Sequence, residues 1–463
     1  MSANAVPPPS AASSVEEGKS ADLLLRGGRV HCLDPDANVC EAIAVIDGRI
    51  VATGSDAKLA AFVGPTTEIV ELGGRAVLPG INDAHLHAVW MGARWPKTLF
   101  EEGGGEGAHG RLLSNSGERR EAVLKAWSVM ASLGITSYTE PGIGPEEDNG
   151  ETGCFGTAVL ETYLELAGTA AQTARVTLLR LFGILDGPSD FASMRRGIDV
   201  EVRAADPKWL AIPGIKIFAD GIPPMRNAWL RDPYLGGGHG ELMTGAGGDT
   251  ERLADFTAMV ELAHARRQQV AVHATGDRTI EEFIAIIERL GGADGLRHYV
   301  IHGDLVTPEQ LVRMKQAGMG LALQPLIADL TRDWMAQAVG PATAARAWPL
   351  HLMLGKGMRV VLSSDAPVTS PDWRRSIASA ARQLEGQGIA AGDEMLTELL
   401  RMYTAIPADQ DGALDWKGTI EVGKVADLCV LDRDPYRTGA RNFSDIQVDR
   451  TIVDGRTVFD RIA

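Results

Sequence analysis

Two histidines stand one residue apart in the stretch LPGINDAHLHAVW, residues 78–90, of a chain that has only ten. A strand-like run precedes them, and because strand side chains alternate, His85 and His87 would point to the same face. Imidazole nitrogens are common ligands of zinc and similar divalent ions, so the pair could hold a metal. Taken alone, the pair is a weak signal, because two strand histidines can equally be satisfied core or surface residues.

Further groups of this kind stand at the ends of other strand-like runs. They are Lys216 and Asp220 in GIKIFADG, His273 in VAVHATGD, His302 in HYVIHGD and Asp365 in VVLSSDAPV. Lys216 is unusual, since a lysine that faces a core is costly unless it is paired or chemically changed. His298 has the same parity as His302, but His302 lies nearer the C-terminal end of its strand and is the preferred candidate. Imidazoles and a carboxylate that converge from several strands predict a divalent metal site.

The middle of the chain has the rhythm needed to bring these residues together. Strand candidates alternate with amphipathic helix candidates, and the strand candidates are PGINDAHLH, ITSYTE, VTLLRLFG, GIKIFADG, QVAVHATGD, HYVIHGD, GLALQPL and RVVLSSD. Eight strands that are each followed by helical chain predict an α/β fold, a (β/α)8 TIM-like barrel over residues 79–410. The alternative is a doubly wound open sheet, which would need a Gly-rich phosphate loop after its first strand, and the sequence has none there. In a barrel the active site lies at the C-terminal strand ends.

The two ends of the chain have a different texture, with short β-branched runs broken by glycine. Residues 21–78 and 411–463 are therefore predicted to form one small β-sandwich domain, with the barrel inserted between its two parts. Residues 1–20 are rich in Pro, Ser and Ala, which predicts a disordered tail.

Composition excludes several classes of partner. The 45 Lys and Arg residues against 61 Asp and Glu residues give a formal net charge of −16, which disfavours nucleic acid and anionic membrane surfaces. The sequence shows no membrane-length apolar run and no secretory signal. The four cysteines have no CxxC spacing and are expected to be reduced thiols in a cytoplasmic enzyme, the alternative being a disulfide between Cys32 and Cys40.

Motifs along the chain resemble those of the amidohydrolase superfamily, specifically its YtcJ-like branch (amidohydrolase family 3), which includes N-substituted formamide deformylases. The matching segments, in order, are GINDAHLH, GIKIFADG, VAVHATGDRTIEEF, RHYVIHGDLVTPEQL, LALQP, SSDAPV and GTIEVGKVADLCVLD. The resemblance covers nearly the whole chain after the first twenty residues, and the last segment, from the β-sandwich, is among the more specific.

The resemblance implies a role for each candidate ligand. His85, His87 and Asp365 would bind the more buried metal, and His273 and His302 would bind a second one. Lys216 would be carboxylated and would bridge the two metals, which also removes the cost of a buried cation. The cofactor would be one or two divalent ions per chain, zinc before cobalt, manganese or iron, and Asp365 and His302 would be the catalytic residues.

The sequence departs from these relatives in two places. Ile301 stands before the strand-six histidine, where relatives commonly have glutamate, so polar contacts around that ligand cannot be transferred. The segment between the first two barrel strands is short and includes EEGGGEGAHG, so the lid around residues 100–117 cannot be transferred either. Arg226 falls where relatives often carry an arginine after strand four, and it is either a substrate contact or part of a structural salt bridge.

The implied activity is hydrolysis of a C–N bond in an amide, formamide, carbamate or urea by metal-activated water. Two alternatives stay open. A deaminase or another mononuclear hydrolase of the same fold would use fewer of the six ligands, and a non-catalytic scaffold would keep the fold without the chemistry.

Large apolar residues near the predicted site indicate the substrate. Trp90 and Trp95 follow the first strand in a segment with no obvious helix, Phe218 shares the face of Lys216, and Leu326 follows strand seven. They either pack the barrel mouth or, with Arg226, line a pocket with few charges for a small, largely uncharged N-alkyl or N-aryl substrate. We expect a small-molecule substrate, no nucleic-acid or membrane partner, and a homo-oligomer.

Overall fold

The computed structural model describes residues 19–101, 110–355 and 357–462. The predicted disordered tail lies almost entirely outside the described residues, as does most of the glycine-rich stretch near residue 105. Within the described residues, no helix is both long and apolar enough to cross a membrane. The four cysteines are free thiols.

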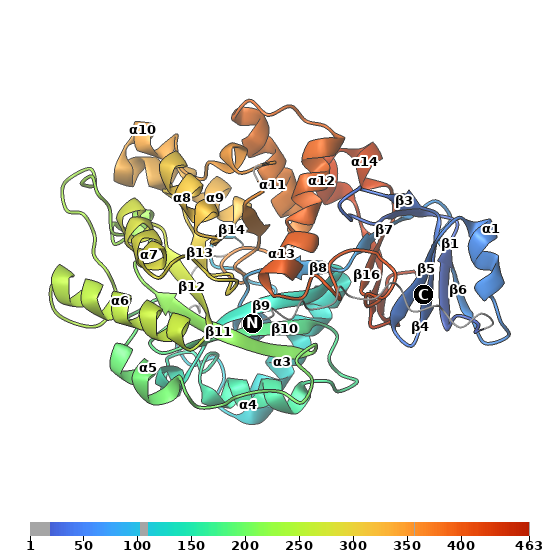
Figure 1. Cartoon of the computed structure of the whole chain (residues 1–463), viewed down its shortest axis with the longest axis horizontal. Coiled ribbons are helices and arrows are strands. Elements are labelled where there is room, and N and C mark those ends of the chain that lie inside the picture. Colours follow the sequence, from blue (N-terminus) through green and yellow to red (C-terminus); the bar gives the residue numbers. More distant parts are fainter. Residues whose placement is uncertain (1–18, 102–109, 356, 463) are drawn as a thin grey trace, which may run out of the picture.

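A sheet of eight parallel strands forms the larger unit (Figure 1). In chain order the strands are β8 (Ile81–Asp83), β9 (Ile135–Ile143), β10 (Arg175–Leu181), β11 (Leu210–Phe218), β12 (Gln269–Ala274), β13 (Tyr299–His302), β14 (Gly320–Leu323) and β15 (Arg359–Leu362). Each pairs with the next in sequence, which is the topology of a (β/α)8 barrel. The eight strand candidates and the predicted fold class are confirmed.

Helices cover the outside of this sheet (Figure 1). The longer ones are α3 (Ser116–Ser132), α4 (Thr157–Leu166), α6 (Asp249–Ala265), α7 (Asp277–Arg289), α8 (Pro308–Gln316), α9 (Pro325–Val339), α11 (Trp373–Gly386) and α12 (Asp393–Arg401); the shorter ones are α2 (Ala88–Arg94), α5 (Phe191–Gly197), α10 (Pro341–Ala344) and α13 (Ala405–Gln410). At the start of α8, Thr307 accepts a hydrogen bond from the Gln310 N–H while the Gln310 side chain accepts one from the Thr307 N–H, the capping box that TPEQ predicts.

The barrel interior is filled by a small apolar cluster. It consists of Ala84, Leu179, Ala271, Tyr299, Ile301, Ala322 and Val361. Because side chains alternate along a strand, the next inward residues toward the C-terminal ends come from the same strands two positions later. His273 lies two positions beyond Ala271 on β12, so the apolar cluster lies beneath His273, whereas Lys216 on β11 is level with Ala271.

The first and last strands of the sheet are not paired in the strand ladder, and the seam between them is closed just beyond their C-terminal ends. The Asp365 N–H donates to the His85 carbonyl at 2.8 Å, and the His87 N–H donates to the Ala366 carbonyl at 2.7 Å. Asp83 adds a side-chain link, accepting from the N–H groups of His85 (3.2 Å) and Ser364 (3.1 Å). The seam thus closes at the residues predicted to bind metal.

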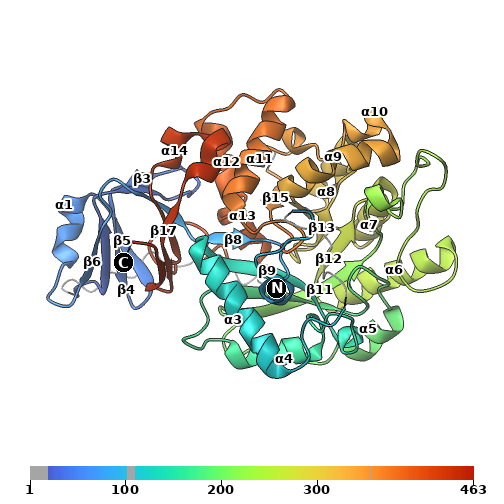
Figure 2. The same cartoon turned by 180° about the vertical axis from the view of Figure 1, so that it is seen from behind.

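The smaller unit stands to one side of the barrel (Figures 1 and 2). One of its sheets has the order β5-β4-β1-β6 and the other β18-β17-β16-β7-β2-β3. The strands are β1 (Leu23–Arg26), β2 (Arg29–His31), β3 (Val39–Cys40), β4 (Ala42–Ile46), β5 (Arg49–Gly54), β6 (Glu68–Glu71), β7 (Ala76–Pro79), β16 (Leu428–Leu431), β17 (Val448–Val453) and β18 (Arg456–Asp460), with the short helices α1 (Asp56–Leu59) and α14 (Pro435–Thr438). Antiparallel pairing of β7 with β16 joins the two chain ends, as the sequence indicated.

Arg175, at the N-terminal end of β10, connects the barrel to the smaller unit. Its guanidinium donates to both oxygens of Asp427 at 2.7 and 3.1 Å and to Asp454 at 2.9 Å. It also lies over the rings of Trp209 and Trp416, 4.4 and 5.3 Å from their centroids. This contact is at the barrel end opposite the strand termini that carry the candidate ligands.

Candidate metal centre

Three of the predicted ligands form a compact, buried group at the barrel seam. The group consists of His85, His87 and Asp365, and their donor atoms all lie within 4.8 Å of one another. Asp365 Oδ1 is 3.0 Å from His85 Nε2 and 3.5 Å from His87 Nε2. Donors bound to one tetrahedral zinc at about 2.0–2.1 Å would be about 3.3 Å apart. The donor types and their spacing therefore fit a divalent ion.

The local backbone is arranged to present these side chains. Strand β8 ends at Asp83, and the following bend carries His85 and His87 into the barrel mouth. Asp365 follows β15 with φ 55°, a left-handed conformation that is unfavourable for a residue other than glycine. His302 has φ 72° at the end of β13. Such strain is typical of functional sites, where the surrounding structure holds a side chain in a required direction.

The other three predicted ligands adjoin this group. The His302 ring centroid is 5.4 Å from that of His85 and 4.5 Å from that of His273. His273, His302 and Lys216 line one cavity together with His85, His87 and Asp365. The structure therefore brings all six predicted residues to one site. Asp220, by contrast, accepts hydrogen bonds from Thr275, Gly276, Trp229 and Thr279, and it supports the loop that leads into α7.

Each of three histidines has one ring nitrogen beside an acceptor. His302 Nδ1 is 2.8 Å from Gln324 Oε1, His273 Nε2 is 3.1 Å from the Gly221 carbonyl, and His87 Nδ1 is 3.2 Å from Glu140 Oε1. A proton on that nitrogen leaves a lone pair on the other one, which can bind metal. Sequence reasoning missed Gln324 and Glu140. Gln324 lies in the quoted LALQP motif, and Glu140 is the last residue of the strand candidate ITSYTE.

Burial sets the charge state of these groups. It lowers the pKa of His85 and His273 far below the usual value and that of His302 to about 3, because a buried imidazolium is poorly solvated. The rings are therefore neutral at pH 7, as a metal ligand requires. Burial also lowers the pKa of Lys216 to about 8, although Asp365 and Asp186 oppose the shift. Among the described residues, no carboxylate lies within ion-pair distance of Lys216.

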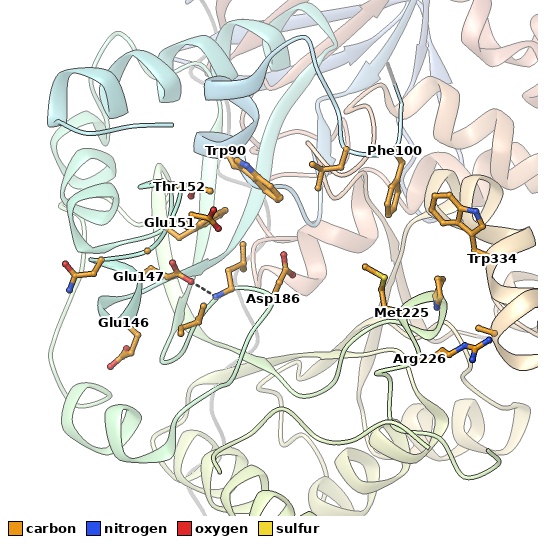
Figure 3. Close-up of a pocket in the computed structure, with 18 of the residues that line it drawn as sticks. Trp90, Phe100, Glu146, Glu147, Glu151, Thr152, Asp186, Met225, Arg226 and Trp334 are labelled. Carbon is orange, nitrogen blue, oxygen red and sulfur yellow. Dashed lines mark hydrogen bonds between the residues drawn. The ribbon is translucent and has the colours of Figure 1, made fainter. Parts of the chain in front are cut away.

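The site opens into a cavity of about 380 Å³ lined by the six candidate ligands together with Trp90, Phe218, Asp186 and Asp304. A wider outer cavity of about 1300 Å³ shares Trp90, Phe100, Asp186 and Met225 with it. Figure 3 shows Glu146, Glu147 and Glu151 on one side of the outer cavity, Trp334 and Arg226 on the other, and Asp186 between them. The expectation of few charges is wrong for this outer cavity, because loops that sequence reasoning did not place here supply carboxylates.

The residues predicted to bind substrate separate into two groups. Phe218 stacks on His273 with ring centroids 3.9 Å apart, and Trp90 lines both cavities. Arg226 lines only the outer cavity, and it forms no ion pair within the described residues. Trp95 and Leu326 line neither cavity: Trp95 packs against the apolar core, and Leu326 is buried.

Helical structure explains both misplacements. The segment after strand one contains the helix α2, so the expectation of no helix there is wrong; Trp90 faces the cavities from its first turn, and Trp95 lies beyond its end. Strand β14 likewise ends before α9 begins at Pro325, and in that helix Ile327 and Thr331, four residues apart, face the cavity. Period-two alternation does not extend into either helix.

Comparison with known proteins agrees with this architecture. The model of the amidohydrolase family matches residues 94–459. That span includes Lys216, His273, His302 and Asp365 and begins after His85 and His87. The protein YtcJ of Bacillus subtilis is 22% identical over 95% of this chain and 99% of its own length. The N-substituted formamide deformylase of Arthrobacter pascens is 32% identical, over 42% of this chain and 36% of its own length.

Solved structures share the fold. A metal-dependent hydrolase from Pyrococcus furiosus superposes with a TM-score of 0.71 at 20% identity, over 89% of this chain and 99% of its own. An adenosine deaminase from Xanthomonas campestris, solved with bound zinc, superposes with a TM-score of 0.65 at 18% identity, over 96% of this chain and 94% of its own.

Proposed function

The chain belongs to the amidohydrolase family, and from that premise we propose that it is a metal-dependent hydrolase that cleaves a C–N bond in a small amide, formamide, carbamate or urea. The observation that carries this proposal is the convergence of His85, His87 and Asp365 at the C-terminal ends of the barrel strands. Catalytic groups in this fold lie at that end. A cavity large enough for a small molecule adjoins them.

His85, His87 and Asp365 would hold one divalent ion, and His273, His302 and Lys216 a second. When bound, the metal supplies Lewis acidity, which polarises the scissile carbonyl and acidifies the attacking water. The Asp365 carboxylate would take the proton from that water and would then give it to the departing amine nitrogen. His302 is held by Gln324 so that Nε2 is available at the reacting centre.

Lys216 would serve as a carboxylated ligand. Its amine attacks carbon dioxide and loses a proton, giving a carbamate anion in place of a cation. A lowered pKa favours this reaction, because only the neutral amine is nucleophilic. Its ammonium nitrogen lies 5.4 Å from the centre of the Phe218 ring, with no anionic partner in ion-pair range within the described residues. Carboxylation would replace this ammonium with an anion that can bind metal.

The lining of the two cavities favours neutral substrates over anionic ones. Trp90, Phe218 and Phe100 offer apolar surface for an N-alkyl or N-aryl group. Asp186, which lines both cavities, would repel a carboxylate or a phosphate near the metal. We therefore keep carbamates, amides and ureas with uncharged nitrogen substituents as the first compounds to assay.

The test is a screen of the zinc- and cobalt-loaded enzyme against N-alkyl and N-aryl formamides, amides, carbamates and ureas. Charged N-acyl amino acids serve as the comparison set. Asp365→Asn and chelator-treated protein are the controls, and both should lose turnover. If charged N-acyl amino acids react faster than the neutral compounds, the substrate assignment is wrong. If turnover survives complete metal removal, the metal-dependent mechanism is wrong.

A mononuclear hydrolase, such as a deaminase, is the second candidate. It is favoured by the compact group of His85, His87 and Asp365, which by itself offers three ligands to one ion. Metal stoichiometry of the active enzyme separates the two: two ions per chain support the binuclear site with carboxylated Lys216, and one ion per chain supports the mononuclear enzyme.

A further inference from the structure

Glu140 is a buried carboxylate whose surroundings indicate a specific task. It is the sixth residue of β9, a strand in which every position is buried, and its own exposure is 0%. Among the described residues, no lysine or arginine pairs with it. A carboxylate in such a place is costly unless hydrogen-bond donors satisfy it. The hydrogen bonds of Glu140 therefore indicate its role.

Both oxygens of Glu140 are occupied. Oε2 accepts from the Ala88 N–H at 2.7 Å and from the Tyr163 hydroxyl at 2.8 Å. Oε1 is 3.2 Å from His87 Nδ1. On the other side of the same ring, His87 Nε2 faces Asp365 Oδ1 at 3.5 Å. The carboxylate thus contacts the predicted ligand at the nitrogen that points away from the metal centre.

A chain of buried donors fixes the direction of these hydrogen bonds. Trp127 Nε1 can only donate, and it lies 3.1 Å from the Tyr138 hydroxyl, which lies 3.1 Å from the Tyr163 hydroxyl. Burial and the charge of Glu140 raise the pKa of both tyrosines, so they remain protonated donors. Every group that reaches Glu140 from this side donates to it. The carboxylate is left as a pure acceptor for His87.

We propose that Glu140 is a positioning residue that holds His87 with its proton on Nδ1, so that the Nε2 lone pair is directed at the metal. The same carboxylate accepts from the first N–H of α2, the helix that places Trp90 over the cavity. One side chain therefore sets both a metal ligand and a wall of the substrate cavity. This inference rests on the proposed function to the extent that it assumes a metal at His87.

Glu140→Gln is the informative variant, because it keeps the shape but replaces one acceptor by a donor. The glutamine oxygen would stay with the two donors, the Ala88 N–H and the Tyr163 hydroxyl. Its NH₂ group would then donate to His87 Nδ1 and move the ring proton to Nε2, the atom that should bind metal. Tyr163→Phe is the matched control, since it removes one hydrogen bond to the carboxylate but leaves the contact with His87.

The readout is the zinc dissociation constant of the refilled apoprotein, measured by competition with a chromophoric chelator. Loss of such an outer contact typically weakens metal affinity about 10- to 100-fold, and we expect a loss in that range for Glu140→Gln. Tyr163→Phe should stay within about threefold of wild type by the same reasoning. Zinc affinity of Glu140→Gln within threefold of wild type would overturn the proposal.

A second measurement does not depend on any variant folding. In metal-free wild-type protein, ¹⁵N NMR of the His87 ring should show the Nδ1–H tautomer, and an Nε2–H tautomer would overturn the proposal. Failure of the proposed function is distinguishable: wild-type protein that binds no zinc at all would refute the metal centre, whereas intact wild-type affinity with an unaffected Glu140→Gln variant refutes only the role of Glu140.

Discussion

Replacing Arg175 should separate stability from function, because this residue joins the two units at the barrel end away from the metal centre. Arg175→Met keeps the length of the side chain and its contact with Trp209 but removes the charge. It leaves Asp427 buried without its bidentate partner. The side chains of Arg175 and Asp427 are 3% and 6% exposed, so neither can exchange its partner for water.

The expected magnitude follows from that burial. Breaking a buried ion pair by removing one partner typically costs about 3–5 kcal/mol, most of it the penalty of the stranded charge. The contact with Asp454 adds less than about 1 kcal/mol, because that side chain is 38% exposed. We therefore expect Arg175→Met to lower the free energy of unfolding by about 3–5 kcal/mol.

Urea unfolding followed by tryptophan fluorescence and by far-UV circular dichroism measures this change. The double variant Arg175→Met with Asp427→Asn should recover more than half of the loss, because it removes the stranded charge as well. Metal content and kcat/KM at 20 °C should stay within about twofold of wild type, because the substitution leaves the C-terminal strand ends, which carry the site, unchanged. A loss below 1 kcal/mol, or a double variant no more stable than the single one, would refute the reasoning.

Three further predictions concern the site and the pH dependence of stability. Asp365→Asn should retain the fold by circular dichroism and lower kcat by at least about 10²- to 10⁴-fold, because it removes both a ligand and the proton acceptor; a variant within threefold of wild type would exclude this role. Trp90→Ala should raise KM about ten- to a hundredfold, from the loss of roughly 1.5–3 kcal/mol of apolar contact, and an unchanged KM would exclude Trp90 from the substrate cavity. His298, hydrogen-bonded to the Val270 N–H, has its pKa lowered by burial to about 3. The unfolded chain, with a histidine pKa of about 6.5, takes up the proton first, so this stability is fully present above pH about 6.5 and is lost as pH falls toward 3. Urea unfolding at pH 7 and pH 5 should show that His298→Asn loses about 2 kcal/mol less than wild type over that interval; equal losses would contradict the pKa assignment.

The sequence predicted the barrel well because most of its strands are short runs rich in apolar residues, and several of them end in a polar residue. His85, His273, His302 and Asp365 stand at such ends, and parallel strands bring their C-terminal ends to one edge whatever the connecting helices do. Lys216 was predictable for another reason, the cost of a buried cation. These signals are local, so a single sequence carries them.

What could not be predicted depends on contacts between distant segments. Glu140 ends the strand candidate ITSYTE, but its contact with His87 appears only when β9 is placed beside the bend that carries His87. The seven-residue helix α2 is too short for its periodicity to be distinguished from a loop, which misplaced Trp95. The carboxylates of the outer cavity come from loops, whose positions sequence patterns do not set.

The first and last barrel strands are not paired in the strand ladder, and this has a consequence for folding during synthesis. His85 and His87 leave the ribosome 278 residues before Asp365, counted from His87, and the seam hydrogen bonds between the two segments need both. The antiparallel pair of β7 and β16 is completed later still. A nascent chain therefore carries two exposed sheet edges until synthesis is nearly finished, and exposed edges invite pairing with other chains. Closure of the seam is the step that ends this exposure, and a metal bridging His85, His87 and Asp365 would lock it.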